Sequence, residues 1–320
     1  MPLTIGRAPG SHRRTTAVDM LWPTGRSGDL VLRCSGRDLR TVTDSEVETL
    51  DEAQLHVEID FAGGRAVRSI RSDPGEPGLA SLVGTSAAAG FRRAAAGAAP
   101  RHLAERDVLY QLLDDVPVTS LIAGYAVTAL NRPDTLRSAQ LLNRADICAG
   151  FQSGGTMMQL VSQRGTAAIV VGPEAPDVGR DDPHGWHDLP PLEPTAMRRR
   201  RLLDVSPDGA GRLRVFAWFR DTFRHPDGAE TIVHEYHVDA QVEAESRRIV
   251  SVTAAPHVLP WPECVQAAGS AERLIGATLP DLRDDVRSAF AGTSTCTHLN
   301  DQLRSLTDVI PLAEACARLR

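Results

Sequence analysis

The 320-residue sequence contains no lysine: all 35 of its basic residues are arginine. Without lysine the chain cannot form a Schiff base with pyridoxal phosphate or with a carbonyl substrate, and it cannot build a Walker-type phosphate loop. It also lacks a Gly-x-Gly-x-x-Gly turn after a strand and a Gly-x-Ser-x-Gly nucleophile elbow. We therefore expect a protein that works without an organic cofactor.

Several other features are scarce or missing. Aromatic residues make up only 4% of the chain, so the core must rest on aliphatic side chains. The net charge of −6 is spread without a basic stripe, which argues against a nucleic-acid partner. The chain starts without the apolar segment of a signal peptide, and its longest near-apolar stretch, 118–130, is too short to span a membrane. The five cysteines form no Cys-x-x-Cys pair and fit reduced thiols, so we expect a cytoplasmic protein that binds no membrane.

Two long stretches of the sequence resemble each other, one beginning near Arg13 and the other near Arg198. Six short matches follow in the same order and at nearly constant spacing, which chance rarely produces. A repeat of this length predicts two copies of one unit packed as a pseudo-dimer, at residues 1–150 and 198–320. Residues 151–197 are then a connector or a lid, because a long irregular connection usually has a working role.

Each copy is typical of strands followed by helices. Apolar and polar residues alternate over 55–61 and again over 232–240, as in strands with one buried face. Gly63–Gly64 predicts a tight turn, and helices are expected around 79–83 and from Asp107 onward. The predicted class is α+β, with about four antiparallel strands and then two helices in each copy.

His298 is the strongest candidate for chemistry. Thr293, Ser294 or Thr295 is expected to cap a helix whose first turn holds His298, and Asp301 lies three residues further on the same face. The positive end of the helix dipole keeps the imidazole neutral, so it can act as a general base. The alternative is a structural histidine that only forms hydrogen bonds near a buried helix start.

A second candidate is the insertion Pro256–Cys264 in the second copy. Its three prolines predict a stiff loop at the end of a strand, where binding groups commonly lie. Trp261 in this loop would stack on a ligand or line a pocket, and His257 and Glu263 add ionisable groups. The alternative is a helix cap with a tryptophan filling a gap.

Comparison of the copies favours the second as the place of function, because it alone has gained ionisable groups. The aligned pairs are His298 with Gln111, His257 with Gly75 and Asp301 with Asp114. We predict that His298 is the base, that Asp301 or Asp114 orients it, and that Glu263 or His257 is the acid. The predicted substrate-binding residues are Trp261, Trp186, His187 and Cys296. His56 and His237 align with each other, which favours a structural role for both.

We predict no metal site. A zinc site built from Cys264, Cys296, His257 and His298 would match no known ligand spacing. The segment from His234 to His237 is one residue short of a metalloprotease motif, and its alternation is that of a strand. A nucleophilic Cys296 at the helix start stays open as an alternative.

The segment Cys296–Leu299, with the Asn and Asp that follow, resembles the C-terminal signature of the bacterial domain-of-unknown-function family 2889. Further similar features are Leu109–Pro117, Ala145–Gly150, Gly185–His187 and Leu259–Cys264. The resemblance extends over nearly the whole chain and implies a bacterial, cytosolic protein, but no reaction. The residues themselves favour a small-molecule enzyme that performs acid–base lyase or hydrolase chemistry. The alternative is a non-enzymatic ligand-binding or assembly module, and either protein could form a homodimer.

Overall fold

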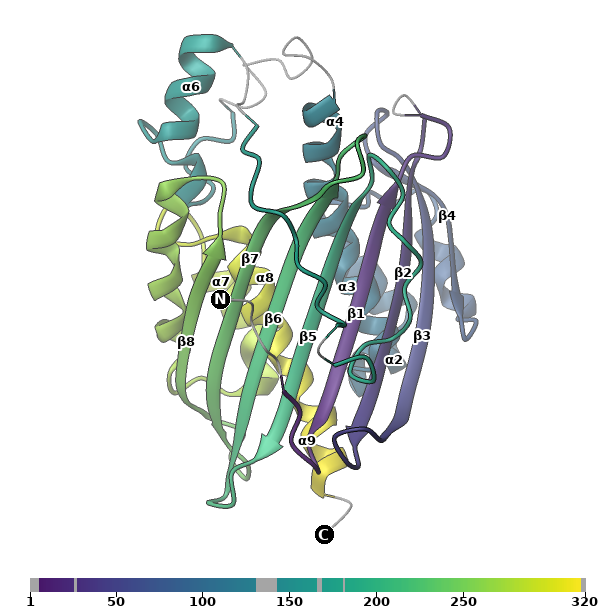
Figure 1. Cartoon of the computed structure of the whole chain (residues 1–320), viewed down its shortest axis with the longest axis vertical. Helices are drawn as coiled ribbons and strands as arrows, with labels where there is room; N and C mark the ends of the chain where they lie inside the picture. The colour runs from purple at the N-terminus through teal and green to yellow at the C-terminus, as the bar shows by residue number, and fades with distance from the viewer. Residues whose placement is uncertain (1–5, 26–27, 131–142, 166–168, 181, 318–320) are drawn as a thin grey trace.

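An antiparallel sheet of eight strands forms the centre of the computed structural model, which describes residues 6–25, 28–130, 143–165, 169–180 and 182–317. The strands are β1 (His12–Leu21), β2 (Leu30–Thr41), β3 (Val47–Asp60), β4 (Ala66–Asp73), β5 (Met197–Pro207), β6 (Arg212–Arg224), β7 (Glu230–Glu243) and β8 (Ile249–Val258). They follow the order β4-β3-β2-β1-β5-β6-β7-β8, so β1 and β5 pair at the middle of the sheet (Figure 1). The predicted α+β class and the antiparallel strands are confirmed.

The hairpins follow from local sequence. The turn between β3 and β4 holds Gly64 at a φ of +101°, a backbone conformation that glycine adopts at no steric cost. Every second residue of β2 is buried from Leu30 to Asp38, as expected for a strand with one face against the core, and the alternation shifts at Leu39, where the pairing with β3 changes register. β1 differs because all ten of its residues are buried. A strand with no exposed residue must be covered on both faces of the sheet.

Helices cover one face of the sheet, the rear face in Figure 1. After β4 come η1 (Pro77–Leu82), α1 (Phe91–Ala98), α2 (Pro100–Glu105), α3 (Val108–Ile122) and α4 (Gly124–Leu130). After β8 come η3 (Pro262–Leu274), η4 (Leu279–Asp281), α7 (Leu282–Ala289), α8 (Thr297–Ser305), η5 (Leu306–Asp308) and α9 (Val309–Ala317). α3 begins directly after Asp107, close to the predicted start, and the Asp107 carboxylate caps it by accepting the Tyr110 N–H at 3.0 Å. Each half carries more than the two helices expected, since 3-10 segments and short helices link the longer ones.

Two aliphatic cores lie between the sheet and the helices. One packs β1–β4 against α1 and α3, and the other packs β5–β8 against η3, α7, α8 and α9. Ion pairs join the strands at the middle of the sheet. Arg13 of β1 pairs with Asp204 of β5, and Arg198 of β5 pairs with Asp19 of β1. The two ion pairs occupy equivalent positions of the antiparallel β1–β5 ladder: exchanging the two strands converts one pair into the other.

Part of the segment between the halves crosses the middle of the other face of the sheet, which the helices named above leave uncovered and which we call the open face (Figure 1). The segment contains η2 (Ala149–Phe151) and α6 (Thr156–Arg164), and its later part crosses the front of β5 and β1 without regular structure (Figure 1). Trp186 and His187 in this part are both buried. This covering explains why β1 has no exposed residue.

The prediction of a stiff loop over Pro256–Cys264 is wrong in its bounds. Pro256 and His257 belong to β8, only 259–261 are irregular, and η3 starts at Pro262. β8 tolerates Pro256 because it is an edge strand and the pairing with β7 shifts register there.

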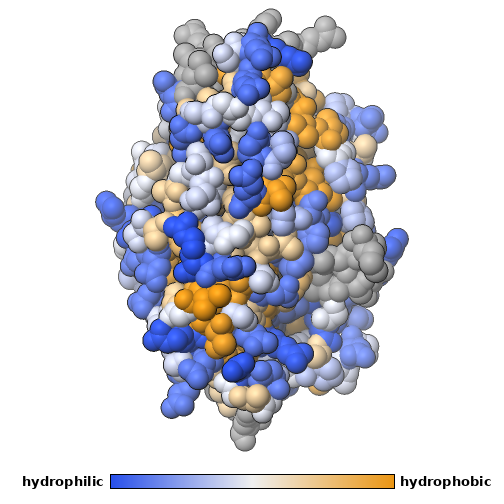
Figure 2. Space-filling model, turned by 90° about the vertical axis from the view of Figure 1, so that its left-hand side faces the viewer, coloured by the Kyte–Doolittle hydropathy of each residue, from blue (hydrophilic) through white to orange (hydrophobic). Residues whose placement is uncertain are grey.

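The molecular surface on the β8 side, the left-hand side in Figure 1, is mainly hydrophilic, with two apolar patches (Figure 2). Among the described residues, the helices are all too short or too polar to cross a bilayer.

Candidate functional site

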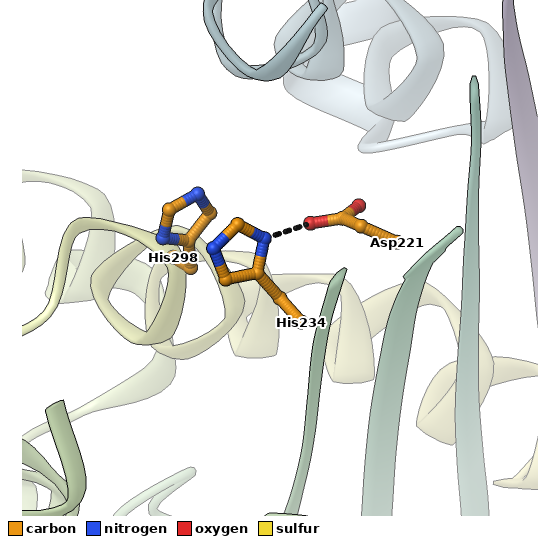
Figure 3. Close-up of side chains that lie close together, drawn as sticks. All are labelled: Asp221, His234 and His298. Carbon is orange, nitrogen blue, oxygen red and sulfur yellow. Dashed lines mark hydrogen bonds and ion pairs between the residues drawn. The ribbon is translucent and has the colours of Figure 1, made fainter. Parts of the chain in front are cut away.

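Three ionisable side chains meet where the start of α8 lies against β6 and β7. Asp221 comes from β6, His234 from β7 and His298 from α8 (Figure 3). His234 Nδ1 lies 3.2 Å from Asp221 Oδ2, and the rings of His234 and His298 stack with centroids 3.9 Å apart and planes at 25°. The result is a chain of contacts from a carboxylate through one imidazole to a second.

Arg199 of β5 fixes the carboxylate end of this chain. Its Nε donates to Asp221 Oδ1 at 2.7 Å and its Nη2 donates to Oδ2 at 2.9 Å. Burial alone would raise the pKa of Asp221, but the ion pair with Arg199 and the contact with His234 outweigh burial and lower that pKa. Asp221 therefore stays ionised and can hold the N–H of His234.

His298 forms the other end. Its Nδ1 lies 3.9 Å from Cys296 Sγ, while its Nε2 is buried and has no hydrogen-bond partner in the described part of the chain. Burial lowers the pKa of His298 well below its usual value, and the charges of His234 and Arg199 act in the same direction. Asp221 and Asp301 oppose the shift without reversing it. The His298 ring is therefore neutral at physiological pH, as predicted for a general base.

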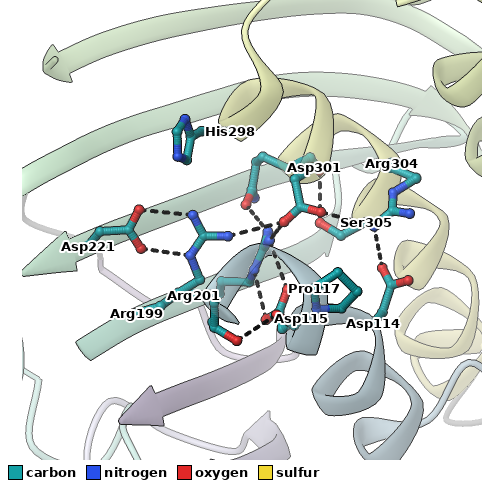
Figure 4. A network of polar contacts seen from close by, with 12 residues as sticks. Asp114, Asp115, Pro117, Arg199, Arg201, Asp221, His298, Asp301, Arg304 and Ser305 are labelled. Carbon is teal, nitrogen blue, oxygen red and sulfur yellow. Dashed lines mark hydrogen bonds and ion pairs between the residues drawn. The ribbon is translucent and has the colours of Figure 1, made fainter. Parts of the chain in front are cut away.

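The structure does not pair Asp301 with His298 directly. Asp301 is the centre of a buried ion network, in which it accepts from Arg92, Arg199, Arg201 and Arg304 (Figure 4). Because Arg199 also holds Asp221, that arginine links Asp301 to the site by hydrogen bonds. Asp114 of α3 lies in the same network and pairs with Arg92, Arg283 and Arg304. Both carboxylates have low pKa values, because several arginines outweigh the effect of burial.

The two predicted acids lie in other surroundings. His257 Nε2 is 2.6 Å from His237 Nδ1, between β8 and β7. Glu263 accepts the N–H and the hydroxyl of Thr156, at 2.6 and 2.8 Å, and so caps the start of α6. Within the described residues, no hydrogen bond or ion pair joins His257, Glu263 and His298 to one another. Their shared role in catalysis stays a prediction.

The predicted substrate-binding residues are dispersed as well. Trp261 packs against the Met157, Met158 and Val161 cluster, and Trp186 packs edge-on against Trp218 with ring centroids 5.7 Å apart. His187 lies between two hydroxyl groups on the open face of the sheet. Only Cys296 lies next to His298.

Cys296 also corrects the predicted helix cap. The N-cap residue of α8 is Cys296, and its side chain makes no capping hydrogen bond. Thr293, Ser294 and Thr295 precede the cap, and the Thr295 hydroxyl donates to the Gly292 carbonyl instead. Burial raises the pKa of the Cys296 thiol, which disfavours the thiolate that a nucleophile requires.

In the part of the chain that the structure describes, the same three residues, Asp221, His234 and His298, also form a set that could hold a metal ion. Their ligand atoms lie within 4.8 Å of one another, and two histidines with a carboxylate are a ligand set known for zinc and for non-haem iron. Two features oppose this use. Imidazole lone pairs lie in the ring plane, so stacked rings do not point at one ion, and both oxygens of Asp221 already accept from Arg199. An ion would have to unstack the rings and compete with a guanidinium.

Sequence reasoning identified His298 but did not assign roles to Asp221 and His234. His234 occupies the apolar side of its strand, in line with Ile232, Tyr236 and Val238. A histidine among buried apolar residues requires a polar partner, so the position of His234 in this row is a local signal for a buried polar contact. Asp221 carries a comparable signal, because it stands in line with the buried Ala217, Phe219 and Phe223 of β6, but neither pattern names the partner, which lies on another strand.

Residues 197–311 match a family model described as "Protein of unknown function (DUF2889)". The match confirms the resemblance over β5 to the start of α9, and it contains the segments Leu259–Cys264 and Cys296–Leu299. The similar features before residue 197 lie outside it. No curated protein and no solved structure matched the chain.

Proposed function

We propose, on the premise that residues 197–311 carry a DUF2889 domain, that the protein is a small-molecule enzyme that performs acid–base chemistry with His298, His234 and Asp221. The observation that carries the proposal is the buried, unpartnered Nε2 of His298 beside a histidine that a carboxylate holds. Such an arrangement provides an imidazole that can accept a proton and a neighbour whose tautomer is fixed. Lyase and hydrolase reactions both use a base of this kind.

Because the rings of His234 and His298 stack, the two imidazoles would have different roles in proton transfer. Like charges at this separation repel strongly, so the pair favours one proton over two. Asp221 stabilises that proton on His234, which leaves His298 as the base. So that the pair never holds two protons, His234 would give its proton to the substrate as His298 takes one, and His234 is the acid in place of Glu263 and His257, which form no hydrogen bond or ion pair with His298 among the described residues.

An internal duplication would explain why these groups occur in the second half only. We propose copies at 1–150 and 198–320, and the arrangement of the strands supports this, because their order is the same when counted from either edge of the sheet. Ion pairs support it too: Arg14 holds Asp38 with the same two nitrogens that Arg199 uses on Asp221. If the halves are related, rotating β1–β4 onto β5–β8 should bring α3 onto α8. Helices that fail to coincide would contradict the duplication.

The proposed duplication also predicts which residues the first copy has instead. Asp221 lies opposite His234 in the β6–β7 ladder, and Asp38 lies opposite Asp51 in the β2–β3 ladder. Gln111 takes the place of His298. The first copy therefore keeps the arginine–aspartate pair but has neither imidazole, which supports a single site in the second copy.

The experiment is a comparison of metabolite extracts incubated with wild-type protein and with His298→Gln. Mass spectrometry should show at least one metabolite that only the wild type consumes. The control is His56→Gln, at a half-buried histidine on β3, which should act as the wild type does. Thermal unfolding of each variant verifies that it is folded. Consumption that survives His298→Gln, or no consumption by the wild type, would contradict the enzyme and favour the ligand-binding or assembly alternative.

A divalent-metal site is the second candidate, because Asp221, His234 and His298 are close enough to share an ion. The test is dialysis against zinc, manganese or ferrous ion, followed by metal analysis of wild type and His234→Gln. We expect no stoichiometric metal that depends on His234. One ion per wild-type chain, lost in the variant, would replace acid–base chemistry with metal chemistry.

Two further predictions concern the whole chain. Light scattering can test the homodimer, and hydrogen exchange can test whether residues 151–197 act as a lid.

A further inference from the structure

The open face of the sheet contains a cavity with an unusual concentration of arginine. The cavity has a volume of about 340 Å³, within the usual range for small-molecule sites. Its floor comes from β5 and β6, and its rim comes from the segment that crosses the sheet. The four arginines that line it are Arg198, Arg200, Arg220 and Arg224.

Two of these arginines have protein partners. Arg198 donates to both oxygens of Asp19, at 2.5 and 2.9 Å, and also to the Pro190 carbonyl. Arg220 donates to Glu235 and to the Pro176 carbonyl, at 2.8 Å. Their charges are thus compensated, and their positions are fixed.

The other two, Arg200 and Arg224, have none among the residues that the structure describes. Neither side chain makes a hydrogen bond or an ion pair there, and the Nε of each is buried. Two acids line the same cavity, but Glu230 accepts from the Thr222 hydroxyl and Asp177 accepts from the Gly179 N–H. Burial lowers the pKa of Arg200, and the neighbouring Arg198 lowers it further, while Glu230 and Asp177 oppose both effects. A charged guanidinium in this position is costly unless an anion is bound to it.

We infer that this cavity binds a small organic anion, with its carboxylate or phosphate group between Arg200 and Arg224. The planar guanidinium groups present paired donors that match both kinds of oxyanion. Apolar side chains of the crossing segment, Leu189, Pro190, Pro191 and Leu192, also line the cavity and suit a hydrocarbon or aromatic portion of the ligand. The site is independent of His298, because Arg198 and Arg200 alternate along β5 with Arg199, which lies on the helix side.

Thermal unfolding of the full chain tests this inference. The probes are inorganic phosphate, phenyl phosphate and benzoate, each compared with sodium chloride at equal ionic strength. We expect at least one probe to raise the unfolding midpoint and to saturate, whereas general salting effects increase without saturating. A response to the two phosphates identifies a phosphate site, and a response to benzoate alone identifies a carboxylate site.

The variants are Arg200→Gln and Arg224→Gln, and the matched control is Arg93→Gln, an exposed arginine on α1. Each cavity variant should bind the probe at least about tenfold more weakly, because charge-assisted hydrogen bonds are lost, and the control should bind normally. Without ligand, Arg200→Gln should unfold at no lower temperature than the wild type, since a guanidinium without a partner adds no stability. The inference is overturned if no probe stabilises the wild type beyond chloride. It is also overturned if binding survives in both cavity variants.

Discussion

His187 anchors the segment that crosses the sheet by hydrogen bonds to β1 and β2. Its surroundings allow an estimate of how much protonation of His187 lowers the free energy of unfolding. Its Nδ1 lies 2.9 Å from the Thr15 hydroxyl and its Nε2 lies 3.0 Å from the Ser35 hydroxyl, in a residue only 7% exposed. Burial lowers the pKa of His187 to about 4, and the positive charges of Arg37, Arg200 and Arg198 contribute to the lowering. Burial and these positive charges therefore keep the imidazole neutral in the folded protein.

The consequence for stability follows from the two pKa values. The unfolded chain has a histidine pKa of 6.5, above the folded value of about 4, so the unfolded state binds the proton first as the pH falls. This residue leaves the free energy of unfolding unchanged above pH 6.5 and reduces it progressively between 6.5 and 4. At about pH 4.5 the reduction is about 2.5 kcal/mol, a large part of the stability of an ordinary domain.

Urea unfolding of wild type and His187→Gln, at neutral pH and at about pH 4.5, measures this effect. Glutamine keeps a donor and an acceptor for the two hydroxyls but does not titrate. The wild type should lose about 2.5 kcal/mol more than the variant between the two pH values. Contributions of His298 and other groups cancel in the comparison. Equal losses in both proteins would refute the buried, neutral state of His187.

Three further changes test the packing around the site. Asp301→Asn should reduce the free energy of unfolding by about 3–5 kcal/mol, because buried arginines lose a shared partner, and a loss below about 1 kcal/mol in urea would contradict the network. Gly36→Ala should cost about 1–3 kcal/mol, since the new Cβ would lie 2.7 Å from Val108 Cγ1, and unchanged stability would show that α3 can move away. Glu263→Gln should weaken the cap of α6 by about 1 kcal/mol. Hydrogen exchange should then speed up in α6 alone, and an unaltered α6 would disagree with the capping role.

Much of the fold could be predicted because it depends on neighbouring residues. Alternation over 55–61 and 232–240 predicted strands, Gly63–Gly64 predicted the hairpin, and Asp107 predicted the start of α3. These signals are local: backbone conformation and burial of one strand face are set by residues a few positions apart. The end of β8 was placed wrongly, because Pro256 is compatible with a strand only at the edge of a sheet, and edge position is a property of the whole sheet.

The candidate site also combines features that local sequence indicates with features that depend on the tertiary structure. The sequence alone determined that the chain has no lysine chemistry, and it indicated a neutral histidine at the start of a late helix. Only the tertiary structure placed His298 against His234, bound His234 to Asp221, and directed Asp301 to arginines instead. Those contacts join strands and helices that are distant in sequence, so they depend on how the layers pack and leave no periodic pattern in the chain. For the same reason the arginine cavity on the open face depends on a segment of the chain crossing β5, which no local pattern records.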